Sequence, residues 1–174
     1  MSDLERLRHS CAHVLATAIT RIWPDAQLAG GPPVENGFYY DIELAHRITP
    51  DDFAKIEAEM KKVVKENQTF ERSTKTRDEA KAFFEERGQS FKVERLADIP
   101  EDEEISFYQN GEFVDLCAGP HVMRTRNVKA YKLLRVAAAY YRGNENNPQL
   151  QRIYGTAFPN KTKLNEWLEA QEEA

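Results

Sequence analysis

Three of the four histidines and both cysteines of this chain fall in two short segments. The first, His9-Ser-Cys-Ala-His13, places two imidazoles four positions apart, so on a helix they lie on one face, one turn apart. The second, Asp115-Leu-Cys-Ala-Gly-Pro-His121, holds a thiol and an imidazole around a Gly-Pro pair that bends the backbone. A lone histidine is most often a packed core residue, but two such pairs favour a functional site.

The side chains that could act together form a His3Cys set: His9, His13, Cys117 and His121. These are the ligand types of a tetrahedral zinc site. Four protein ligands would close a structural site, whereas three would leave a position for a hydrolytic water. Without a metal, the same groups can hold and deprotonate a water or stabilise an oxyanion. A Cys-His nucleophilic pair is the weaker alternative, because it leaves two histidines unused. The spacing alone does not decide between these chemistries.

Both segments must be positioned by regular elements. Apolar residues at helical spacing predict a helix over residues 4–23, which Pro24 ends. Cys11 lies between the two histidines, so it points away from their shared face and is expected to pack as a small apolar residue. A hairpin of strands 105–108 and 112–116, turning at Gln109-Asn-Gly111, is expected to deliver the second segment.

The rest of the chain alternates strand and helix patterns. Further strands are expected over 38–44, 69–74, 91–96, 132–141 and 149–157, and helices over 50–67, 77–87 and 161–174. Alternation puts Phe38 and Tyr40 on one face of their strand and Tyr39 on the other. Just before it, the turn Gly30-Gly-Pro-Pro33 allows a ligand to approach the backbone closely. The prediction is a single α+β domain, a curved antiparallel sheet wrapped around and packed by helices.

Composition and charge narrow the class of protein. With 174 residues, 41% hydrophobic and 30% charged, the chain fits an ordinary globular domain. It has no apolar run of membrane-spanning length and no secretory signal, and its two cysteines suit free thiols, so we expect a cytoplasmic protein without a membrane partner. The net charge of -5 argues against coating nucleic acid. Between residues 121 and 143, however, six basic residues and no acidic ones fit either a solvated surface or a phosphate-binding patch.

Several motifs in order carry a family resemblance. Besides the two segments above, they are Asn36-Gly-Phe-Tyr-Tyr-Asp41, Tyr141-Arg-Gly-Asn144 and Leu150-Gln-Arg-Ile-Tyr-Gly-Thr-Ala157. Together they closely resemble the editing (N2-type) domain of bacterial-type threonyl-tRNA synthetases, in the threonyl/alanyl-tRNA synthetase second-additional-domain superfamily. Alanyl-tRNA synthetase editing domains share the His-His pair of the first segment and the Cys-His pair of the second. They are not expected to carry the motifs that begin at Asn36 and Leu150 in this form.

The resemblance implies post-transfer editing, a proofreading step of translation in which a hydrolase deacylates Ser-tRNA(Thr). Serine lacks one methyl group of threonine, and a missing methyl gives only ~1–3 kcal/mol of discrimination, so a second sieve is needed. It also implies the working residues. Catalytic roles fall on His9, His13, Lys92, Cys117 and His121, and substrate binding on Tyr40 and Asp115. Gly31 and Phe38 are added as candidate walls of the substrate pocket, because the glycine turn allows close backbone approach and the strand offers aromatic bulk.

By the same resemblance, His9 and Cys117 position or deprotonate the attacking water, and His13 and His121 orient them or the ribose. Lys92 supplies positive charge near the ester; without the resemblance it reads as a solvent-facing strand lysine. The alanyl branch holds zinc with the four ligands, whereas the threonyl branch resembles a metal-free hydrolase. We expect no required metal or other cofactor, with zinc at the His3Cys set still open.

The resemblance also implies partners. Residues 1–160 would be the editing domain, and the Glu-rich helix 161–174 a connector toward a catalytic domain that this sequence lacks, so no ATP site is expected. The partners would be the acceptor end of tRNA(Thr) carrying serine and the other synthetase domains, and the connector favours an excised domain over a free-standing factor. The tRNA-binding candidates are Arg124, Arg126, Lys129, Lys132, Arg135 and Arg142. The alternatives are a structural zinc module, a tRNA-binding appendage without hydrolysis, and a free-standing alanyl-editing-like deacylase.

Overall fold

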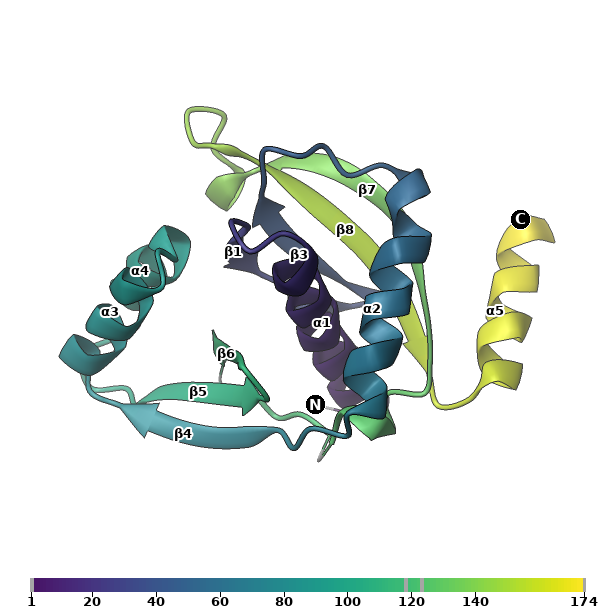
Figure 1. The fold of residues 1–174 in the computed structure, drawn as a ribbon, viewed down its shortest axis with the longest axis horizontal. Coiled ribbons are helices and arrows are strands. Elements are labelled where there is room, and N and C mark those ends of the chain that lie inside the picture. Colours follow the sequence, from purple (N-terminus) through teal and green to yellow (C-terminus); the bar gives the residue numbers. More distant parts are fainter. Residues whose placement is uncertain (1, 118, 123, 174) are drawn as a thin grey trace.

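The computed structural model describes residues 2–117, 119–122 and 124–173, and within them it has five α-helices and two antiparallel sheets (Figure 1). The helices are α1 (Asp3–Ile22), α2 (Phe53–Lys65), α3 (Arg77–Glu86), α4 (Ser90–Leu96) and α5 (Lys161–Glu173). The strands are β1 (Gln27–Gly30), β2 (Pro33–Val34), β3 (Gly37–Glu43), β4 (Glu71–Lys75), β5 (Ile105–Asn110), β6 (Phe113–Leu116), β7 (Ala130–Tyr140) and β8 (Gln149–Phe158). The α+β class predicted from the sequence is confirmed.

The larger sheet has the order β1-β3-β8-β7, with β2 on the edge of β3, and α1 and α2 pack against it (Figure 1). Helix α1 begins at a capping box, in which the Ser2 hydroxyl accepts from the Glu5 amide. Its buried side includes Cys11, which lies in the main core as its place between the histidines predicted. Phe38, Tyr40 and Ile153 cover the same core from the sheet.

The smaller sheet, β4-β5-β6, carries α3 and α4 and has an apolar core of its own. That core is built around Phe84 of α3 and Phe107 of β5, whose rings stack 5.5 Å apart. The expected single sheet is therefore two sheets, because β5 turns its apolar face toward α3 and α4 instead of α1. In Figure 1 the smaller sheet, with α3 and α4, lies to the left of α1, away from α2.

The strand predicted over 91–96 is wrong, because Ser90–Leu96 is the helix α4. Its buried residues Phe91, Lys92 and Leu96 share one helical face, and a short apolar run does not distinguish this pattern from a strand. The Gln89 side chain accepts from the Leu28 amide and donates to the Ala26 carbonyl, so it bonds with the backbone of β1 where a further strand would have paired.

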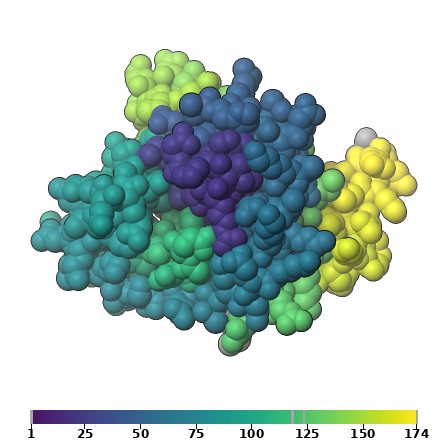
Figure 2. Space-filling view, viewed as in Figure 1, coloured from purple at the N-terminus to yellow at the C-terminus, as the bar shows by residue number. Residues whose placement is uncertain are grey.

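Helix α5 lies apart from the other helices at the end of β7 and β8 (Figures 1 and 2). It packs through the buried Leu164 and through Trp167, whose ring centroid lies 5.9 Å from that of Phe158. Among the described residues, no helix combines the length and the apolar character that crossing a bilayer requires.

Candidate active site

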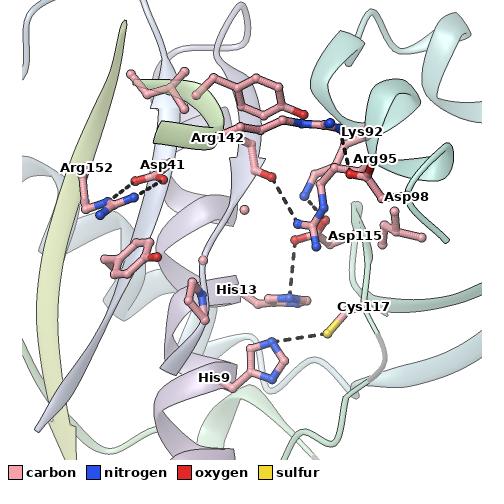
Figure 3. A pocket seen from close by; sticks show the side chains of 18 of the residues that line it. His9, His13, Asp41, Lys92, Arg95, Asp98, Asp115, Cys117, Arg142 and Arg152 are labelled. Atoms are coloured by element: carbon pink, nitrogen blue, oxygen red, sulfur yellow. Dashed lines mark hydrogen bonds and ion pairs between the residues drawn. The ribbon is translucent and has the colours of Figure 1, made fainter. Parts of the chain in front are cut away.

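A cavity of ≈ 630 Å³ opens between the two sheets, and both predicted segments line it (Figure 3). Helix α1 contributes His9 and His13, the turn before β3 contributes Gly31, and α4 contributes Lys92. The loop after β6 contributes Cys117. The site is thus assembled from elements of both sheets and of the helix between them.

Cys117 and two histidines form a close group. The Sγ atom of Cys117 lies 3.3 Å from Nε2 of His9 and 3.3 Å from Nε2 of His121, and it accepts a hydrogen bond from the Gly119 amide. Ala118, within the same segment, lies outside the described residues. The pairing of the two distant segments that the sequence predicted is therefore present in the fold.

A serine fixes the protonation of one ring. The Ser10 hydroxyl donates to the Arg6 carbonyl, so its oxygen can only accept from its other neighbours. Those neighbours are the Val122 amide at 2.9 Å and Nδ1 of His121 at 3.1 Å. Nδ1 of His121 therefore carries the proton, and its Nε2 faces Cys117 as an acceptor.

Burial keeps this group neutral. It lowers the pKa of His9 and, more strongly, that of His121, and it brings the pKa of His13 down to about 4. Burial, with the nearby charge of Asp115, raises the pKa of the Cys117 thiol to about 12. At neutral pH the site holds three neutral imidazoles and a protonated thiol, so Cys117 is a poor nucleophile.

Beside this group lies a buried charged network. The Lys92 ammonium forms an ion pair with Asp115 and donates to the Tyr40 hydroxyl, and that hydroxyl donates to Oδ2 of Asp115 at 2.9 Å. Nε2 of His13 lies 3.4 Å from the same oxygen. All four side chains are at least 96% buried, so α1, β3, α4 and β6 are joined through one carboxylate.

The network holds its charges in place. Burial would raise the pKa of Asp115, but the charge of Lys92 and the hydrogen bonds from Lys92 and Tyr40 outweigh it and lower that pKa to about 2. Burial lowers the pKa of Lys92, while the adjacent Asp115 opposes that shift. Asp115 is therefore a carboxylate, and Lys92 keeps its proton through it.

Two predicted wall residues end up in different places. Gly31 lines the cavity, and a Cβ there would overlap the Tyr39 carbonyl oxygen, so no larger residue fits without backbone movement. Phe38 is fully buried in the main core and does not line the cavity. Tyr39, on the opposite face of β3, lines it instead, because alternate residues of a strand face opposite sides.

The predicted basic patch is divided among several surfaces. Arg142 lines the cavity and pairs with Asp98 at 2.7 Å. Arg126 and Lys129 line a separate groove of ≈ 730 Å³ between α2 and α5. The remaining three lie outside the cavity lining, Arg124 at a bridge to Thr69 and Lys132 and Arg135 on β7.

Several residues of the site were not predicted from the sequence. Ser10 orients His121, and Arg95 of α4 lines the cavity. Arg152, paired with Asp41 through two hydrogen bonds of 2.8 and 2.9 Å, lines it as well. Ser10, Asp41 and Arg152 lie inside the motifs given above. The position of Ser10 on its helix, and the alternation of side chains along the strands of Asp41 and Arg152, could have indicated that they face the site.

The four predicted ligands are arranged as a metal site would require. One ligand atom from each of His9, His13, Cys117 and His121 lies within 4.8 Å of the others. Nδ1 of His13 is buried without a hydrogen-bond partner among the described residues. The donor types and their closeness fit zinc.

Comparisons with known proteins place these observations in a family. Residues 105–154 match the family described as the threonyl and alanyl tRNA synthetase second additional domain. Over 170 residues, 98% of this chain, the threonine--tRNA ligases of Clostridium novyi (strain NT) and Clostridioides difficile (strain 630) are each 55% identical to it. That of Geobacillus kaustophilus (strain HTA426) is 53% identical over 171 residues, and the chain covers 26–27% of each relative's length. The chain thus spans about a quarter of the length of the curated relatives it matches.

Proposed function

The chain belongs to the family of the threonyl and alanyl tRNA synthetase second additional domain, and on that premise we propose that it is an editing hydrolase that deacylates Ser-tRNA(Thr). The observation that carries this proposal is the neutral Cys117 group beside the Lys92–Asp115 ion pair in one cavity. Its volume of ≈ 630 Å³ lies within the range of small-ligand sites, as the aminoacyl end of a tRNA requires.

The chemistry is hydrolysis of the ester between serine and the terminal ribose. A water attacks the ester carbonyl, and neutral His9 accepts its proton as the general base. The bond between the carbonyl carbon and the ribose oxygen then breaks, and the ribose oxygen takes that proton from His9 as serine leaves. Cys117, a protonated thiol in hydrogen-bond contact with His9, positions that water and does not attack the ester itself. The Lys92 ammonium stabilises the negative oxygen that develops on the carbonyl carbon, and His121 and His13 hold the reacting groups in place.

The same cavity supplies the second sieve. Asp115 provides the carboxylate of the buried network and binds the ammonium of serine. The wall at Gly31 lies directly on the backbone of β3, so it does not yield to the additional methyl group of threonine. Tyr40 fixes the position of Asp115 through its hydroxyl.

The partners proposed with this function are the acceptor end of tRNA(Thr) and the other domains of a threonine--tRNA ligase. We assign residues 1–160 to the editing domain and 161–174 to a connector helix, of which Ala174 lies outside the described residues. The support is that α5 contacts the rest of the chain at the ends of β7 and β8.

A second candidate, a structural zinc module, is favoured by the closeness of the four ligand atoms. His9, His13, Cys117 and His121 would hold the ion, and bound zinc supplies a water of lowered pKa when one position stays open. Metal content measured on the purified chain, together with hydrolysis, separates the two candidates.

The test is release of serine from Ser-tRNA(Thr), with Thr-tRNA(Thr) as the second substrate. We expect serine release that spares threonine and falls at least ~100-fold in Cys117→Ala. Cys11→Ala is the matched control, because it removes a thiol from the core side of the same helix that carries His9 and His13. Equal rates in wild type and Cys117→Ala would contradict the proposal.

A further inference from the structure

The outer face of the larger sheet carries alternating arginines and tyrosines. The Arg135 guanidinium carbon lies 4.1 Å from the centroid of the Tyr154 ring, and that of Arg152 lies 4.0 Å from the centroid of the Tyr39 ring. The two tyrosine rings are 5.7 Å apart at 60°. We call these four residues the arginine–tyrosine stripe.

The register of the sheet explains the stripe. Tyr39 of β3 pairs with Tyr154 of β8, which pairs with Arg135 of β7, so the three side chains stand in a row across three strands. Their neighbours Tyr40 and Ile153, on the opposite face, belong to the core that covers α1. Arg135 is exposed and the tyrosines are half-buried, so the row lies open on the face away from that core.

The stripe is continuous with the cavity. Tyr39 and Arg152 line the cavity, whereas Arg135 and Tyr154 do not. Arg152 is held by its two hydrogen bonds to Asp41, so the stripe has a fixed end at the cavity and extends from it toward β7. Among the residues that the structure describes, Arg135 has no carboxylate within 4.0 Å, so its charge is available at the far end.

This chemistry suits single-stranded nucleic acid. Bases stack on tyrosine rings and guanidinium planes, and arginines pair with the phosphates between them. The row of stacking surfaces ends at the cavity where the ester would be hydrolysed. A single-stranded nucleic acid bound along this row would therefore place its last nucleotide in the cavity. A packing role alone would need neither a free guanidinium nor continuity with the site.

We propose that the arginine–tyrosine stripe binds the unpaired nucleotides that precede the terminal adenosine of the substrate tRNA. This rests on the proposed function, since it concerns the same site. Arg135 is the one member that the basic patch of the sequence already included, and the tyrosines supply the stacking surface that charge alone does not show.

The experiment compares Ser-tRNA(Thr) with seryl-adenosine, the ester of serine with adenosine alone, which fills the cavity but does not extend to Arg135 and Tyr154 at the far end of the stripe. In Tyr154→Leu and Arg135→Gln, the KM for Ser-tRNA(Thr) should rise about tenfold, and the KM for seryl-adenosine less than about twofold. Tyr154→Phe keeps the ring and should retain the wild-type KM. Arg87→Gln is the control, because Arg87 also stacks on an aromatic ring, that of Phe83 at 3.7 Å, but at the end of α3.

An unchanged KM for Ser-tRNA(Thr) in both variants would overturn the proposal, and so would an equal rise for both substrates. Binding of a fluorescent CCA-ended tetranucleotide, followed by polarisation, separates this from the editing function. If wild type hydrolyses neither ester, editing fails, and the stripe is then judged by whether Tyr154→Leu weakens binding of the tetranucleotide at least about fivefold. Equal binding by wild type and Tyr154→Leu overturns the stripe whatever the hydrolysis result.

Discussion

The proton on Cys117 decides which hydrolysis the cavity supports. Burial raises the pKa of this thiol to about 12, so it is protonated at pH 7 and a thiolate nucleophile is scarce. The nearby imidazoles are neutral. Burial lowers the pKa of His121 so strongly that this ring stays unprotonated, which leaves His9 as the proton acceptor. This combination favours a water that is positioned by sulfur and deprotonated by a histidine.

Cys117→Ser therefore tests the role of the sulfur. A serine hydroxyl can make the same hydrogen bonds to His9 and His121, so we expect serine release within about tenfold of wild type, against a loss of roughly 10²–10⁴ in Cys117→Ala. Single-turnover release of serine measures both variants. A covalent seryl thioester trapped on the wild-type protein, with Cys117→Ser as inactive as Cys117→Ala, would contradict this mechanism.

Asp115 links substrate binding to stability. In Asp115→Asn the buried Lys92 ammonium loses its counter-charge, and we expect the free energy of unfolding to fall by about 3–5 kcal/mol. Lys92→Met added to Asp115→Asn should regain most of that loss, but not the hydrolysis. Urea unfolding measures the stability, and Asp98→Asn, which breaks an exposed pair with Arg142, should change it by less than about 1 kcal/mol. A double variant no more stable than Asp115→Asn would show that the ion pair is not the cause.

At the scale of helices and strands, the spacing of apolar residues predicted which side chains share a face of an element. The α1 pattern predicted both histidines on one face, and the alternation of β3 placed Tyr39 and Tyr40 on opposite faces of the strand. Alternation did not tell which face of β3 meets the cavity, so Phe38 was expected there although it is a core residue. The run at Phe91 is too short for its period to be read, and its helical form shows only in the structure, where α4 packs against α3 and β1.

The turn before β3 allows a test at this scale. Gly31→Ala and Gly37→Ala both place a Cβ against a backbone carbonyl oxygen, but only Gly31 lines the cavity. We expect both to lower the free energy of unfolding by about 1–3 kcal/mol. Only Gly31→Ala should also reduce serine release at temperatures where both variants are folded. Equal activity in the two would mean that the turn is not a wall of the site.

Across the whole molecule, the site depends on contacts that no local pattern contains. Cys117 meets His9 across 108 positions of sequence, and Lys92 reaches Asp115 from the helix α4. The paired motifs indicated that the first contact exists, because both carry reactive side chains. Only the family resemblance predicted that Lys92 belongs to the site, because nothing in a short apolar run indicates that its single lysine is buried.

The fold is expected to be the same with and without a bound metal. His121 is already held by Ser10 and Cys117, and Cys117 by Gly119, so the cluster has protein partners without an ion. The sheets are joined through the Asp115 network as well. After dialysis against a chelator, we therefore expect an unchanged urea midpoint and unchanged serine release. One zinc per chain, with unfolding on chelation, would instead identify the cluster as a structural zinc module, because metal binding would then supply folding free energy.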